Sequence, residues 1–158
     1  MKHQFRSQAL IAFICVILIP VFSYAQPSNN ECSAAILLTS SPTCVNTAGT
    51  NVNATYNPST LPGVTAGCGA TDKYDVWYTF VAVSTTQTIT VSSAPSQIRL
   101  QLFSGTCGAF TSLACSNNNN FITYASLTIG NTYYIRVYTQ NSNTGAFNIC
   151  VTYAPPVN

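Results

Sequence analysis

Hydrophobic and polar side chains alternate with a period of two through much of this chain. Ile98, Leu100 and Leu102 share one side of an extended segment, and Arg99 and Gln101 share the other. The same alternation recurs in residues 87–92, 132–140 and 146–153. Successive side chains of a strand point to opposite faces. Each segment is therefore predicted to place one face in a core and the other in water, as in antiparallel sheets.

The pattern predicts eight or nine strands and an all-β, antiparallel two-sheet sandwich. Stretches rich in Val, Ile, Thr, Tyr and Phe are separated by Gly, Pro, Asn and Ser, which favour turns. Glu31 to Leu38 is compatible with a short helical turn, although Ile36-Leu37-Leu38 would equally open a strand. The other expected strands are Thr47–Tyr56, Tyr74–Val83, Gln87–Ser92, Gln97–Phe103, Ser112–Cys115, Ile122–Ile129, Thr132–Gln140 and Ala146–Tyr153.

Residues 1–25 have the features of a signal peptide. Basic residues precede an apolar run at 9–19, which is too short to span a bilayer. Ser23-Tyr24-Ala25 then supplies small residues for cleavage after Ala25. The alternative is an uncleaved anchor. A lipoprotein is disfavoured because Cys15 lies inside the apolar run. If the leader is cleaved, we expect no membrane span in the remaining chain.

We expect one sandwich domain at 26–154, followed at 155–158 by the start of a linker or a truncated tail.

Charged side chains are scarce in the chain after the leader, and their signs balance. They are Lys73, Arg99, Arg136, Glu31, Asp72 and Asp75. Three bases are too few for nucleic-acid binding, which requires many phosphate contacts. Nor does any histidine remain to act as a base near neutral pH, so we expect no enzyme.

Six cysteines follow the leader, and an even number in an exported chain predicts up to three disulfides. Cys107 and Cys115 flank a short excursion, so their pairing would close an easily formed ring. The other four cysteines allow three connectivities, among which we favour Cys32–Cys150 and Cys44–Cys68. Free thiols and a metal site are the alternatives, but zinc-type spacing is absent.

Five motifs resemble those of the secreted pre-peptidase C-terminal (PPC)-like β-sandwich domains found in surface and secreted proteins of Bacteroidetes. They are Asn30-Glu31-Cys32-Ser33-Ala34-Ala35-Ile36, Asp75-Val76-Trp77-Tyr78-Thr79-Phe80, Leu102-Phe103-Ser104-Gly105-Thr106-Cys107-Gly108 with Leu113-Ala114-Cys115, Gly130-Asn131-Thr132-Tyr133-Tyr134-Ile135-Arg136-Val137, and Gly145-Ala146-Phe147-Asn148-Ile149-Cys150-Val151. The resemblance implies a jelly-roll-like sandwich that aids attachment to substrates or surfaces. Some such domains bind calcium, but the acidic run that many carry after Leu-Ala-Cys is replaced here by Ser116 to Asn119.

Two groups of residues are candidates for binding. Glu31, Asp72 and Asp75 would supply carboxylate oxygens to calcium if the fold gathers them. The alternative is three separate solvated carboxylates. Aromatic side chains on predicted outward positions would stack on sugars or fill protein pockets, or else pack within the sheet. These are Phe103, Tyr134 and Tyr138. Trp77 and Tyr78 are expected in the core.

The predicted function is a non-catalytic attachment module of a secreted or cell-surface protein. Its partner would be a glycan or an extracellular protein surface. A structural spacer of a larger surface protein, with no ligand of its own, is the alternative. No cofactor is expected unless the acidic residues bind calcium. The sequence leaves the oligomeric state open.

Overall fold

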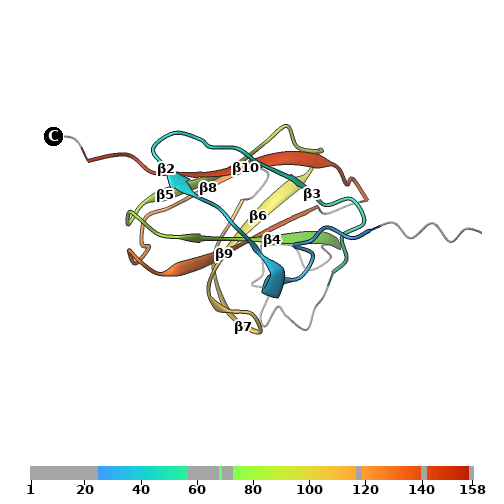
Figure 1. Ribbon diagram of the computed structural model, residues 1–158, viewed down its shortest axis with the longest axis horizontal. Helices are drawn as coiled ribbons and strands as arrows, with labels where there is room; N and C mark the ends of the chain where they lie inside the picture. Colours follow the sequence, from blue (N-terminus) through green and yellow to red (C-terminus); the bar gives the residue numbers. More distant parts are fainter. Residues whose placement is uncertain (1–24, 57–67, 69–72, 117–118, 140–141, 157–158) are drawn as a thin grey trace, which may run out of the picture.

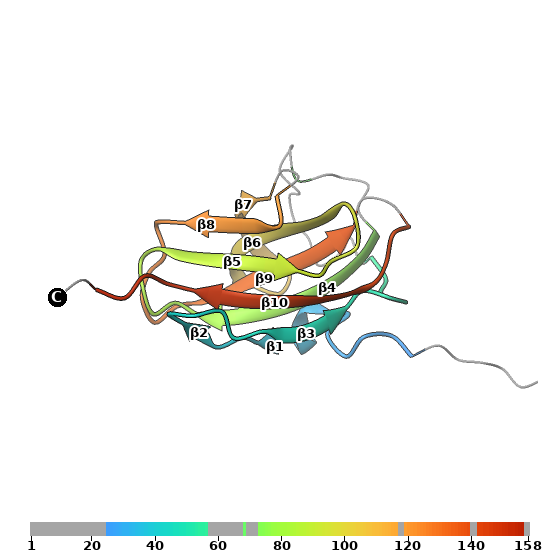
Figure 2. The ribbon, with the colours of Figure 1, turned by 90° about the horizontal axis from the view of Figure 1, so that it is seen from above.

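The computed structural model describes residues 25–56, 68, 73–116, 119–139 and 142–156. These residues form two mixed β-sheets that pack face to face as a β-sandwich (Figures 1 and 2). Residues 1–24 of the predicted leader lie outside them, as does Asp72. No helix in the described part of the chain has the length and apolar composition needed to cross a bilayer.

The first sheet, sheet A, contains the two longest strands and follows the order β1-β4-β9-β6-β7. Its strands are β1 (Ile36–Leu37), β4 (Lys73–Val81), β9 (Thr132–Thr139), β6 (Ile98–Thr106) and β7 (Ala109–Cys115). A short 3-10 helix, η1 (Cys32–Ala34), precedes β1. The sequence left a helical turn and the start of a strand as alternatives for this segment, and the structure contains both, one after the other.

The second sheet, sheet B, follows the order β2-β10-β5-β8, and β3 also pairs with β10. Its strands are β2 (Ser40–Ser41), β3 (Thr47–Thr50), β5 (Gln87–Ser92), β8 (Phe121–Tyr124) and β10 (Ala146–Thr152). Figure 2 shows β8, β5 and β10 lying across the strands of sheet A. At one side of the sandwich, β8 contacts β6 and β7, which closes that edge.

The prediction of purely antiparallel sheets was wrong at two places. Strand β1 runs parallel to β4, and β2 runs parallel to β10. Both pairings arise because one extended segment crosses from the edge of sheet A to the edge of sheet B (Figure 1). It pairs with each sheet for only two residues. Strand β2 lies beyond the first predicted segment, Glu31 to Leu38, and it raises the number of described strands above the eight or nine predicted.

The main core lies between the sheets and follows the period-two pattern. Ile98, Leu100 and Leu102 on β6 are almost fully buried, as are the inward residues of β5, β9 and β10. Burying these side chains contributes roughly 1.5–3 kcal/mol each relative to exposure. The alternation thus fixed the inner faces of both sheets.

The outer face of sheet A departs from the prediction because it is buried too. Trp77, Phe103 and Phe110 pack there with Cys32, and we call this group the outer core. The segment before β1 covers it. The backbone carbonyl of Asn29 accepts a hydrogen bond from the Trp77 N–H at 2.8 Å. The side-chain amide of Asn29 donates a second one to the Trp77 carbonyl, also at 2.8 Å. Period two identifies the two faces of a strand, but it does not show that both are covered.

All three predicted cysteine pairings were wrong. The disulfides join Cys32 to Cys107, Cys44 to Cys150 and Cys68 to Cys115, with Cα–Cα distances of 5.9, 5.5 and 5.7 Å. Cys107 lies in the β6–β7 turn, whereas Cys115 ends β7. An extended strand of that length separates its ends by roughly 20 Å, far beyond the reach of a disulfide.

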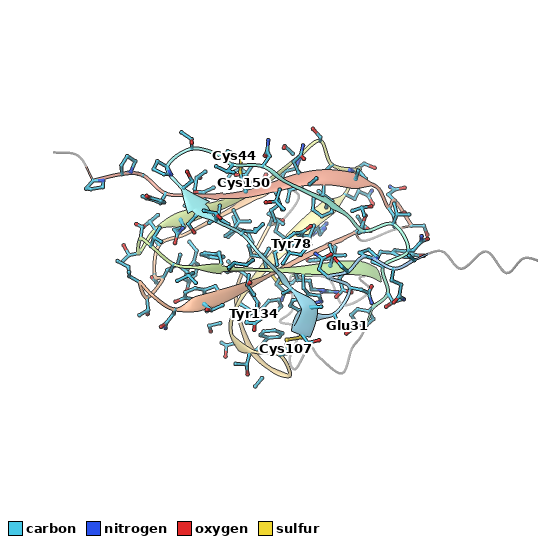
Figure 3. All side chains as sticks on the ribbon, in the orientation of Figure 1. Glu31, Cys44, Tyr78, Cys107, Tyr134 and Cys150 are labelled. Atoms are coloured by element: carbon cyan, nitrogen blue, oxygen red, sulfur yellow. A yellow bond between two sulfur atoms is a disulfide. The ribbon has the colours of Figure 1, made fainter. Side chains whose placement is uncertain are left out.

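The pairings Cys32–Cys150 and Cys44–Cys68 fail because the sandwich separates their members. Cys32 belongs to the outer core on sheet A, whereas Cys150 belongs to a strand of sheet B. Cys150 is bonded to Cys44 in the segment between β2 and β3 (Figure 3). Cys68 is bonded to the end of β7 in sheet A. Ring size along the sequence gave no information on these positions.

Candidate functional site

The predicted aromatic binding face is largely filled by the protein itself. Phe103 and Tyr138 lie on the outer face of sheet A, as predicted, but they are only 2% and 0% exposed because that face is covered, so the prediction that they are open to a ligand was wrong. The Phe103 ring lies 5.7 Å from that of Trp77 and 5.0 Å from that of Phe110. Tyr134 keeps partial exposure, but its ring packs 5.0 Å from Phe110. These rings stabilise the outer core, and Tyr134 alone keeps a partly open surface among the three predicted residues.

A buried ion pair lies on the same outer face of sheet A. Arg136 on β9 donates from Nε to Asp75 Oδ2 on β4 at 2.7 Å, and both side chains are almost fully buried. The guanidinium also stacks over the rings of Tyr138 and Tyr56, at 4.4 and 5.4 Å from their centres. The Tyr138 hydroxyl donates to the Cys68 carbonyl. This polar cluster connects Tyr56 and Cys68 to the outer face of sheet A.

The predicted calcium ligands fit this arrangement only in part. Burial raises the pKa of Asp75, the Arg136 charge opposes that effect, and Glu31 lies near enough to raise this pKa slightly further. Because Asp75 already accepts a hydrogen bond from Arg136, calcium would have to compete for its carboxylate. Within the described residues, no three His, Cys, Asp or Glu side chains are placed to hold a metal. With Asp72 outside that part of the chain, a calcium site stays a prediction.

A second candidate region is an open hollow of about 300 Å³ where the two sheets part. It lies at the edge of the sandwich opposite β7 and β8, between β1 of sheet A and β3 of sheet B. We call it the edge slot. The residues that line it are Pro27, Ser28, Asn29, Ile36, Ala48, Gly49, Thr50 and Tyr78. Aliphatic groups, hydroxyls and amides are mixed in this lining.

Tyr78 brings a buried polar group to the edge slot. Its side chain projects inward from β4 between the sheets, where its ring meets that of Phe147 edge-on at 6.2 Å (Figure 3). The residue is 0% exposed, and no described residue meets strict hydrogen-bond geometry with its hydroxyl, although the Asn29 side chain lies close enough to act as a weak donor to it. Burial raises the pKa of Tyr78 to about 12, against a smaller opposing effect of the Asn29 side chain. The hydroxyl therefore remains protonated at neutral pH.

Gly49 makes room for the Tyr78 hydroxyl. A Cβ at this position would overlap the hydroxyl oxygen and would also come within 2.7 Å of the Phe147 ring. Gly49 pairs with Phe147 across the β3–β10 ladder, so the β3 backbone cannot easily move away. Only glycine lets the strand approach the tyrosine so closely.

Asn51 anchors the end of β3 beside the edge slot. Its amide nitrogen donates to the Tyr74 carbonyl at 3.1 Å and to Thr139 Oγ1 at 3.2 Å. Its side-chain oxygen accepts from the Gly145 N–H at 2.9 Å. The side chain is fully buried and connects this edge strand to both sheets. The wall of the slot is therefore rigidly positioned.

Sequence reasoning placed Tyr78 in the core but missed its relation to the edge slot. One signal was available, because a tyrosine at an inward position between Val76 and Phe80 brings a hydroxyl that needs a partner. Nothing in the sequence indicated that β3 would pass over that hydroxyl.

Comparison with known families identifies the group to which the chain belongs. A family model described as "Galactose binding domain-like", of the T9SS-associated group, matches residues 28–151 and so spans nearly all of the described sandwich. No curated protein and no solved structure matches the chain. The T9SS association implies secreted or cell-surface proteins of Bacteroidetes, with which three disulfides are consistent. The chain belongs to the T9SS-associated family of galactose-binding-domain-like modules.

Proposed function

We propose that the chain is a non-catalytic attachment module that binds a carbohydrate on an extracellular surface. The observation that carries this proposal is the family match over residues 28–151, because it covers both sheets and both walls of the edge slot. Within the described residues, the buried carboxylate of Asp75 accepts a hydrogen bond from Arg136. That contact suits a structural role better than proton transfer.

The edge slot supports binding in place of the aromatic face that the sequence suggested. Ligand sites are usually concave, largely apolar and provided with a few polar groups that orient the ligand. The edge slot has this character, whereas Phe103 and Tyr138 are closed off in the interior. The PPC-like resemblance remains a prediction within the same class of secreted β-domains.

Two binding screens of the exported, processed chain test the proposal. One uses a glycan array, and the other uses a panel of matrix proteins. We expect saturable binding to at least one glycan, and the same preparation should show no turnover of the bound sugar. Silence on both panels would contradict the attachment function. Hydrolysis of a bound glycan would contradict its non-catalytic character.

A spacer role is the second candidate, and the positions of the chain ends favour it. In Figures 1 and 2, the first described residues and the C-terminal tail leave the sandwich at opposite ends of its long axis. If residues 1–25 are cleaved as expected, a module with this arrangement would hold whatever follows its C-terminal tail away from the end at which the mature chain begins. Absence of glycan and protein binding by the intact folded domain would favour this role.

A further inference from the structure

The expected cleavage after Ala25 makes Gln26 the first residue of the exported chain, followed by Pro27. An N-terminal glutamine carries an amine and a side-chain amide on the same residue. Attack of the amine on the amide carbon closes a five-membered lactam ring, and intramolecular reactions of this kind are strongly favoured over the same reaction between molecules. An ordinary α-amine has a pKa of about 8, so part of it is neutral and nucleophilic at neutral pH.

The structure leaves the Gln26 side chain free for this reaction. Gln26 is exposed and lies outside the strands, and none of the other described residues forms a hydrogen bond with it. The proline that follows disfavours a helical conformation at Gln26 and holds its backbone extended. The amine and the side-chain amide are therefore both in solvent, where they can meet without displacing another group.

Ring closure at Gln26 leaves the contacts of the next residues intact. Every ring atom belongs to Gln26, so only the torsions of its own side chain change. The ordered contacts begin after it, where the Pro27 carbonyl accepts a hydrogen bond from the Asn30 N–H at 3.0 Å. Asn29 is hydrogen-bonded to both backbone groups of Trp77. A lactam at residue 26 is therefore compatible with the fold as it stands.

The new chain end would lie at the rim of the edge slot. Pro27, Ser28 and Asn29 line this hollow, and none of its lining residues carries a charged side chain. An α-ammonium on Gln26 would place a positive charge beside these neutral groups. Lactam formation removes that charge, so the rim becomes as neutral as the lining.

A blocked terminus also protects a segment on which the sandwich depends. Proteolysis concentrates at chain ends, and aminopeptidases require a free α-amine. Loss of residues 26–29 would remove both hydrogen bonds between Asn29 and Trp77, together with part of the edge slot. Trp77 belongs to the outer core, so its rings would lose part of their cover.

We propose that Gln26 is the N-terminal residue of the exported chain and that it cyclises to pyroglutamate. The α-nitrogen forms a bond to Cδ, and the bond between Cδ and Nε2 breaks. The side-chain nitrogen leaves as ammonia, with the proton that the amine gives up. No oxidant, reductant or other reactant is consumed. This inference rests on cleavage after Ala25 and is independent of the ligand proposed for the module.

Mass spectrometry of the exported, processed chain tests the modification. We expect an N-terminal peptide that begins at residue 26 and has lost the mass of one ammonia. Amine-reactive labelling of the unfolded chain gives a second readout, because Lys73 carries the one side-chain amine after the leader. A cyclised chain should take up a label at Lys73 alone. A free α-amine on Gln26, or a chain that begins at another residue, would overturn the inference.

Gln26→Asn is the matched control. It keeps an amide but shortens the side chain by one methylene, so ring closure would require a strained four-membered lactam. Pro27 has no N–H, which prevents the next peptide nitrogen from attacking the Asn side chain. We expect this variant to keep the ammonia, to be labelled at its terminus as well as at Lys73, and to focus at a higher pH than the wild-type chain. Equal isoelectric points, or the same loss of ammonia from both chains, would overturn the inference.

Discussion

The Tyr78 and Tyr133 hydroxyls are both inside the sandwich, yet they are in opposite situations. The Tyr133 hydroxyl accepts a hydrogen bond from the Thr128 N–H at 2.8 Å, whereas among the described residues the Tyr78 hydroxyl has only a weak contact with the Asn29 side chain. Each ring packs against another aromatic side chain: Tyr78 meets Phe147 edge-on, and Tyr133 stacks against Phe80. The pair thus separates the effect of the hydroxyl from that of the ring.

We predict that Tyr78→Phe leaves the free energy of unfolding unchanged or raises it, while Tyr133→Phe lowers it by about 1 kcal/mol. The first substitution removes a poorly paired polar group, and the second leaves the Thr128 N–H without its acceptor. Urea unfolding at neutral pH measures both. A loss of stability in Tyr78→Phe equal to that in Tyr133→Phe would contradict a poorly paired hydroxyl.

Alkaline pH should destabilise the fold through Tyr78. Its pKa is raised to about 12 in the folded chain, whereas an unfolded tyrosine ionises near 10. Between these values the folded state holds more protons than the unfolded state, so stability falls as pH rises from 10 to 12. The expected loss is roughly 3 kcal/mol, since each pKa unit corresponds to 1.36 kcal/mol. Rapid unfolding measurements across this range should show a smaller loss in Tyr78→Phe.

Gly49→Ala should destabilise the protein by about 1–3 kcal/mol, as for other overpacked cores. The added Cβ would overlap the Tyr78 hydroxyl and approach the Phe147 ring at 2.7 Å. Gly145→Ala is the matched control, because its Cβ would meet Pro95 at an ordinary 3.5 Å. Thermal unfolding of both variants checks the comparison. Equal melting temperatures would show that β3 can move away from the tyrosine.

At the scale of single strands, the hydrophobic pattern predicted most of the fold. Gln87–Ser92 was predicted with its observed bounds, and the strands around Ile98, Ile135 and Ile149 were found within a few residues. The strand partners of β1 and β2 were not predictable, because two-residue strands carry no periodicity. The burial of the outer face of sheet A was not predictable either, because its polar residues Asp75, Gln101 and Arg136 are typical of a solvent-exposed face.

The ion pair between β4 and β9 provides the element-scale prediction. We expect Arg136→Met to lower the free energy of unfolding by about 3–5 kcal/mol, because it leaves the Asp75 carboxylate buried without its partner. Adding Asp75→Leu should recover part of that loss, since a buried pair replaced by apolar side chains is often tolerated. A double-mutant cycle in urea measures the coupling. Additive losses would show that the two residues act independently.

At the scale of the whole molecule, the disulfides connect parts that the sequence does not relate. Cys32–Cys107 ties η1 to the β6–β7 turn over the outer core, and Cys68–Cys115 ties a distant segment to the end of β7. Spacing along the chain suggested a small Cys107–Cys115 ring because local closure costs little entropy. The fold instead extends β7 between these two cysteines. Pairing depends on where covering segments pass, which periodicity does not report.

Cys44–Cys150 closes the largest of the three rings, with its cysteines separated by 106 positions along the sequence. It also joins the segment that leads into β3 to β10, the strand with which β3 pairs. Removing this bond restores conformational freedom to the unfolded chain, which costs roughly 5 kcal/mol in the chain-entropy model and about 2–5 kcal/mol in typical secreted domains. We therefore predict such a loss for the double substitution Cys44→Ser with Cys150→Ser, together with weaker sugar binding because one wall of the edge slot loosens. Peptide mapping without reductant checks the bond, and chemical unfolding measures its contribution to the free energy of unfolding. A peptide in which Cys44 is linked to Cys68 would contradict both this prediction and the arrangement of the covering segments.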